Sequence, residues 1–73
     1  MSKRNTFYLW LMAQIERDDP VGDLARDVKI DANAPQYAFR ERTWMQHLEN
    51  SHACEGALDA LKRAFDEFAR HNS

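Results

Sequence analysis

The ten residues Asp18–Asp27 read Asp-Asp-Pro-Val-Gly-Asp-Leu-Ala-Arg-Asp, and this stretch decides how the chain folds. An aspartate directly before a helix caps it by accepting backbone N–H groups, and proline suits the first helical position because its missing N–H is not needed there. We therefore predict that Asp19 caps a helix beginning at Pro20, with its carboxylate accepting from Val21 or Gly22. Glycine in a first turn costs stability relative to alanine, so Gly22 indicates close approach of another helix, through the Trp10 ring or the last helix, rather than a ligand.

The same stretch predicts a helix with two different faces over residues 20–30. Apolar side chains recur at steps of three, four and seven, which places them on one buried stripe: Val21, Leu24, Ala25 and Val28. Carboxylates recur at every fourth residue, which places them along another side: Asp19, Asp23, Asp27 and Asp31. Two interpretations of Asp23 and Asp27 stay open: they favour the positive end of the helix dipole and pair with Arg26, Arg17 or Lys29, or they form an acidic ridge for a basic partner.

Helical periodicity extends over most of the chain and predicts an all-α fold. Residues 7–16, 40–49 and 53–70 each carry apolar side chains at helical spacing, whereas alternating β-branched residues are absent. We expect one domain over residues 1–73, a small compact bundle of three to four helices with the longest at the C-terminus, closed around Trp10, Leu24 and Phe65.

Some local features leave alternatives open. Tyr8 and Met12 either close the edge of the core or form an exposed contact patch, and a chain this short favours the core. Residues 36–39 form either a loop or a single helical turn, with the loop preferred. The last helix opens at Ser51 or Ala53.

Composition excludes several classes of protein. The 73 residues include 44% hydrophobic residues with only two Gly and two Pro, which is typical of a folded chain rather than a disordered one. Ten basic and twelve acidic residues leave a net charge of −2, so no overall field attracts nucleic acid or anionic lipid. A single cysteine, Cys54, cannot form an internal disulfide, and the apolar run after Lys3 and Arg4 is too short for a signal peptide or membrane span. We expect a cytoplasmic protein.

Catalytic and metal-binding patterns are weak. One set of possible metal ligands lies close in sequence but matches no zinc spacing: His47, Glu49, His52, Cys54 and Glu55. Neither Cys54 nor Ser51 beside His52 has an evident orienting partner for nucleophilic catalysis, and no glycine-rich phosphate loop occurs. The sequence therefore predicts no enzyme, no metal site and no cofactor.

The chain resembles the YozE-like family with a sterile-alpha-motif-like (SAM-like) fold, a group of short bacterial proteins. The resembling positions span nearly the whole chain: Phe7, Trp10-Leu11, Asp18-Asp19, Val21–Ala25, Asp27, Pro35, His47–Glu49 and Ala57–Phe68. The Gly-Asp-Leu-Ala run after an acidic turn is the most specific of them. The resemblance implies a helical bundle of SAM-like topology, and domains with that fold are mostly protein-interaction modules, with a few that bind RNA.

These observations favour a non-enzymatic adaptor that binds another protein or itself. The candidate partner-binding residues are Asp19, Asp23, Asp27, Arg40 and Arg42. Acidic and basic patches on one module would permit head-to-tail contacts. The alternative is a nucleic-acid-associated regulator in which Lys3, Arg4, Arg40 and Arg42 contact phosphates while Tyr37 and Phe39 stack on bases.

Overall fold

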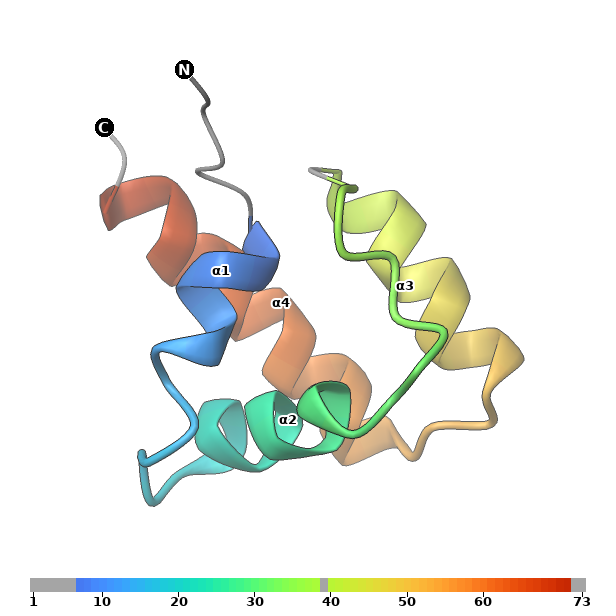
Figure 1. The fold of residues 1–73 in the computed structure, drawn as a ribbon, viewed down its shortest axis with the longest axis horizontal. Coiled ribbons are helices and arrows are strands. Elements are labelled where there is room, and N and C mark those ends of the chain that lie inside the picture. Colours follow the sequence, from blue (N-terminus) through green and yellow to red (C-terminus); the bar gives the residue numbers. More distant parts are fainter. Residues whose placement is uncertain (1–6, 39, 72–73) are drawn as a thin grey trace.

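The computed structural model describes residues 7–38 and 40–71, and these residues contain four helices and no strand (Figure 1). The helices are α1 (Phe7–Met12), α2 (Pro20–Lys29), α3 (Glu41–Asn50) and α4 (Glu55–His71). The longest helix is the last one, with 17 residues. The predicted all-α fold is therefore confirmed.

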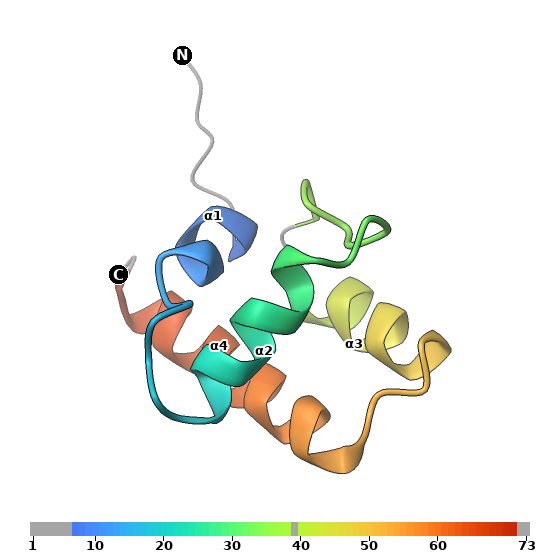
Figure 2. The same cartoon turned by 60° about the horizontal axis from the view of Figure 1, so that its bottom comes forward.

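Helix α4 forms the base on which the other helices pack. α1, α2 and α3 each contact α4, and α1 also contacts α2. In Figure 1, α1 lies over the C-terminal half of α4, α2 crosses the bottom of the molecule and α3 lies on the right; Figure 2 shows α2 beside the N-terminal half of α4. The opening turns of α4 and the charged face of α2 therefore become neighbours.

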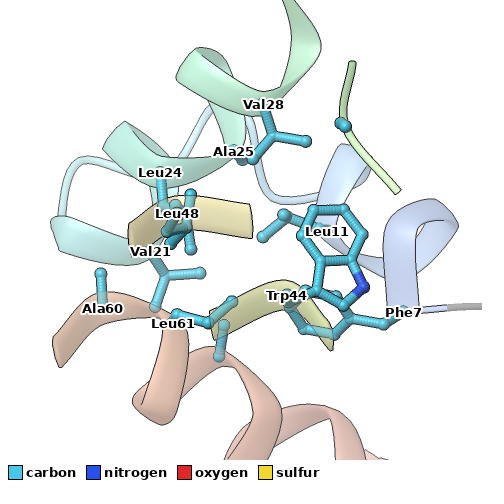
Figure 3. Packing of buried hydrophobic residues seen from close by; sticks show 12 residues of the cluster. Phe7, Leu11, Val21, Leu24, Ala25, Val28, Trp44, Leu48, Ala60 and Leu61 are labelled. Atoms are coloured by element: carbon cyan, nitrogen blue, oxygen red, sulfur yellow. The ribbon is translucent and has the colours of Figure 1, made fainter. Parts of the chain in front are cut away.

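The core is centred on Trp44 and Phe7 rather than on Trp10. Both rings are fully buried, and they meet edge to face with centroids 5.3 Å apart. Figure 3 shows their side chains converging with those of Leu11 and Leu61. The buried stripe of α2 belongs to the same cluster, so all four helices contribute to the core. Trp10 packs against this cluster but is only half-buried.

The expected core member Phe65 is also only partly buried, whereas Leu24 lies inside with 2% of its surface exposed. The Phe65 ring stacks on Phe7 at a centroid distance of 3.8 Å and thus covers the core from the α4 side. Tyr8 and Met12 are partly buried against the core as well, so the core-edge interpretation is confirmed.

The start of α2 agrees with the sequence. The Asp19 backbone is extended, its carboxylate accepts the N–H of Gly22 at 3.0 Å, and Pro20 occupies the start of the helix. The predicted approach of another helix to Gly22 is wrong, because the backbone of Arg17, in the turn before α2, is what packs closely against this glycine. The turn before α2 therefore folds back onto its first turn.

Two helices, α1 and α4, depart from their predicted bounds by more than one residue. α1 ends at Met12 instead of continuing to residue 16, because Ala13 and Gln14 donate their N–H groups three residues back, to the carbonyl oxygens of Trp10 and Leu11, in tighter turns. α4 begins at Glu55, after Ser51 and Ala53, because residues 51–54 terminate α3.

The end of α3 is a turn of Schellman type with a histidine in the left-handed position. His52 has φ 61°, its N–H donates to the Glu49 carbonyl oxygen at 3.1 Å, and the Ala53 N–H donates to the Leu48 carbonyl oxygen at 3.0 Å. The turn redirects the chain from α3 into α4.

The segment between α2 and α3 is a loop with two side-chain anchors. Residues 36–38 are not helical, and Ala38 donates its N–H to the Pro35 carbonyl oxygen at 3.0 Å in a turn, which agrees with the loop interpretation; Phe39 lies outside the described residues. The Trp44 indole N–H donates to the Ala38 carbonyl oxygen at 3.1 Å, and His47 Nε2 lies 2.6 Å from Asp31 Oδ2. Within residues 7–38 and 40–71, no helix is long and apolar enough to cross a membrane.

Candidate functional site: a groove between α2 and α4

A groove of about 700 Å³ lies between α2 and the N-terminal half of α4. Its floor is apolar and consists mainly of Leu24 from α2 and of Ala57 and Ala60 from α4. Leu24 and Ala60 are 2% and 3% exposed, so the floor is the outer surface of the core. Small alanine side chains on the α4 side leave room above the floor for another side chain.

Charged side chains line the groove on both sides. α2 contributes Asp23, Arg26 and Asp27, and α4 contributes Asp59 and Arg63. The Arg26 guanidinium donates to the Asp23 carboxylate, and the Arg63 Nε donates to Glu67, outside the groove, at 3.4 Å. These contacts occupy three of the five charged groups.

The other two charged groups are Asp27 and Asp59, one on each side. Within the described parts of the chain, neither carboxylate has a hydrogen-bond or ion-pair partner, and both residues are exposed. The groove therefore combines an apolar floor with two carboxylates that are available to a positively charged group.

The α2 side of the groove is held in place by Arg26. Its guanidinium donates to the carbonyl oxygens of Ile15 at 2.6 Å and Arg17 at 3.2 Å, in addition to the carboxylate of Asp23. One side chain thus ties α2 to the turn that precedes it, so Arg26 is a structural residue.

Asp19 has a structural role and does not line the groove. Its carboxylate accepts the Gly22 N–H and pairs with Arg17 at 2.7 Å, while Arg17 also pairs with Glu67 of α4 at 2.7 Å. Hydrogen bonds from Arg17, with the Gly22 N–H as a further cause for Asp19, hold the pKa of the Asp19 and Glu67 carboxyls below their usual values. These two carboxylates raise the pKa of Arg17 in turn.

Arg40 and Arg42 lie at the start of α3, away from the groove. Arg40 is the residue before α3, Arg42 is in its first turn, and both are exposed. α3 begins at the top of Figure 1, whereas α2 crosses the bottom, so the predicted acidic and basic patches face different ends of the molecule. Lys3 and Arg4 lie outside the described residues.

The histidines and Cys54 do not assemble into a reactive cluster. His47 contacts Asp31, and its hydrogen bond, together with that from the Asn33 N–H, holds the pKa of Asp31 below its usual value. His52 belongs to the turn after α3, and Cys54 is an exposed thiol at the end of the groove. Among the residues that the structure describes, no group of three or more His, Cys, Asp or Glu side chains could hold a metal ion.

Sequence reasoning missed Asp59 as a groove residue. The sequence assigns it to a solvated pair with Arg63 four residues later, a pattern common on exposed helix faces. Its relevance depends on how α2 crosses α4, and helix periodicity alone does not reveal that crossing.

Comparisons with known proteins agree with this fold. A family model described as the YozE SAM-like fold matches residues 6–70 of the chain. No curated protein and no solved structure matches the chain significantly.

Proposed function

The chain belongs to the family with the YozE SAM-like fold, and we propose that it is a non-enzymatic module that binds another protein through the groove between α2 and α4. The observation that carries this proposal is the position of Asp23 and Asp27. The sequence singles them out as partner-binding candidates, and both line a groove with an apolar floor. An interaction in the cytoplasm is the setting that we propose.

The groove has the composition of a protein-binding surface. Partner segments commonly dock by placing apolar side chains in a groove while polar groups at the edges determine orientation and specificity. The accessible apolar surface of the groove comes from Pro20 and Ala57, above the nearly buried Leu24 and Ala60, and the charges of Asp27 and Asp59 lie at the edge.

Cys54 provides a direct test because it is the only cysteine of the chain and lies at the groove. A benzophenone maleimide on Cys54 is irradiated in an extract of the native host, and crosslinked proteins are identified by mass spectrometry. The matched control carries the same probe on α3, in the variant Cys54→Ser/Glu49→Cys. The proposal predicts a protein that crosslinks from position 54 and not from position 49.

The crosslinked protein is then purified and its affinity is measured by titration calorimetry. Asp27→Lys should weaken binding by about tenfold or more, because it places a like charge against the partner, whereas Glu49→Gln should leave the affinity unchanged. Equal crosslinking from both positions, or equal affinity of the wild type and Asp27→Lys, would contradict the proposal.

A second function, binding of single-stranded nucleic acid, is favoured by one observation. Tyr37 is 83% exposed, close in sequence to Arg40 and Arg42, and an exposed aromatic side chain beside cations is a stacking platform for bases. Fluorescence anisotropy with a labelled single-stranded oligonucleotide at low salt tests it. Binding that weakens steeply with salt and is lost in Arg42→Gln supports this function, and no binding at low salt ends it.

A further inference from the structure

We propose that the segment bound in the α2/α4 groove carries lysine or arginine side chains that pair with Asp27 and Asp59, beside a small apolar side chain that packs on the floor. This inference rests on the proposed function and names the chemistry of the partner. It adds Asp59, on α4, to the residues that select the partner.

Only some of the charged side chains in the groove are paired with one another or with a neighbour. Three carboxylates and two guanidinium groups line it. Asp23 is neutralised by Arg26, and Arg63 donates to Glu67, so the remaining unpaired charge in the groove belongs to Asp27 and Asp59. An acidic segment would therefore meet repulsion from both sides, whereas a basic one would find a carboxylate on each side.

The α4 side of the groove consists of small residues. Ala57 presents its methyl group, Ala60 is almost fully buried beneath it, and the groove also passes Gly56, which has no side chain. Small residues on the α4 side let a partner backbone approach closely, while the exposed Pro20 offers apolar surface on the α2 side. A segment with a small apolar residue flanked by basic residues fits both features.

A second copy of this chain is a poorer match for the groove than a different protein. Four of its arginines already pair with carboxylates of their own chain: Arg17, Arg26, Arg63 and Arg70. The chain also carries a net charge of −2, so two copies repel each other at long range. A different protein with a basic segment is the better match.

The test is a selection from a random-peptide phage library on wild-type protein immobilised through a C-terminal biotin. Selected peptides should be enriched in Lys or Arg next to Ala, Val or Leu. Their affinity, measured by fluorescence anisotropy, should fall by about two- to fivefold in Asp27→Asn and in Asp59→Asn, as expected for one exposed ion pair each. It should also fall as salt rises.

Glu49→Gln is the matched control, because it removes one exposed carboxylate from α3, a helix that contributes no residue to the lining of the groove. Circular dichroism verifies that each variant is folded. Enrichment of neutral or acidic peptides, equal affinity of wild type and Asp59→Asn, or no enrichment at all would overturn the inference.

Failure of this inference differs from failure of the proposed function. Neutral peptides that still compete with crosslinking from Cys54 would show that the groove binds protein without selecting for positively charged side chains. Absence of any crosslink specific to position 54 would remove the proposed function and this inference together. Sedimentation equilibrium of the chain alone tests whether a second copy occupies the groove. A dimer that is lost in Asp59→Lys would overturn the inference of a basic partner and indicate self-association through the groove.

Discussion

The carbonyl carbon of Arg17 lies 2.7 Å from the position that a Cβ atom on Gly22 would occupy, and the Arg17 carbonyl oxygen lies closer still. The same carbonyl oxygen accepts a hydrogen bond from Arg26. A glycine at the third position of α2 thus allows the preceding turn to pack on the helix and to be held there. This contact fixes the direction of α2 and hence one side of the groove.

Gly22→Ala should therefore destabilise the protein even though alanine favours helices. The new methyl group must displace backbone, and overpacking of this kind costs about 1–3 kcal/mol. Gly56→Ala is the control: its Cβ would lie 3.8 Å from the Cys54 Sγ, an ordinary contact, so it should be neutral or stabilising by up to about 1 kcal/mol. Urea unfolding of both variants measures the difference, and equal stability would show that the Arg17 contact is not tight.

Trp44→Ala should unfold the protein or cost about 3–5 kcal/mol, because it empties the centre of the core and removes the hydrogen bond to Ala38. Trp10→Ala should cost about half as much, since Trp10 is only partly buried. Thermal unfolding followed by circular dichroism compares the two. A larger loss for Trp10→Ala would contradict the assignment of Trp44 as the central ring.

His52→Gly should stabilise the protein by about 1 kcal/mol. His52 has φ 61°, a left-handed conformation that costs a side-chain-bearing residue about 1–2 kcal/mol and that glycine adopts freely. The melting temperature should rise by several degrees in a domain of this size. His71→Gly, in the last turn of α4, is the comparison and should not stabilise the protein. A lower melting temperature for His52→Gly would contradict the prediction, because it would mean that the imidazole stabilises the protein by more than the left-handed backbone destabilises it.

Stability should fall below about pH 4, because Asp19, Asp31 and Glu67 each have a pKa lowered in the folded state. A carboxyl whose pKa is lower in the folded state stabilises the protein at pH values above its unfolded pKa. That contribution disappears as the pH falls through the folded pKa.

Arg17→Gln removes the main cause of two of these shifts, those of Asp19 and Glu67. The variant should be less stable than wild type at pH 7 and should lose less stability on acidification. Melting temperatures from about pH 7 to about pH 3 provide the measurement. Parallel curves for the two proteins would contradict the role of Arg17.

Local signals in the sequence were sufficient for α2, whose start depends on adjacent residues: Asp19 caps the helix and Pro20 begins it, as the spacing predicts. The choice between Trp10 and Trp44 as the central ring was not accessible, because both lie on apolar helix faces and only the packing of helices decides which is covered. The packing of Arg17 against Gly22 was not accessible either, because it is a contact between segments that periodicity does not describe.

The residues of the candidate site were likewise only partly predictable from the sequence. Asp23 and Asp27 stand out in the sequence because of their spacing, and both line the groove, whereas Asp19 is held by Arg17, and Arg40 and Arg42 lie elsewhere. Asp59 became a candidate only through the crossing of α2 and α4. A sequence pattern identifies the charges on one helix, but a groove is formed by two helices, and their crossing is not visible in the pattern.

The most direct test of partner binding in the α2/α4 groove is a ¹H–¹⁵N shift titration of the labelled chain with the protein that crosslinks to Cys54. We predict that the largest shift changes occur in α2 around Asp27 and in α4 around Asp59, and that they diminish in Asp27→Lys. Shift changes concentrated at Arg40 and Arg42 instead, with the groove resonances unmoved, would contradict the assignment of the groove as the binding surface.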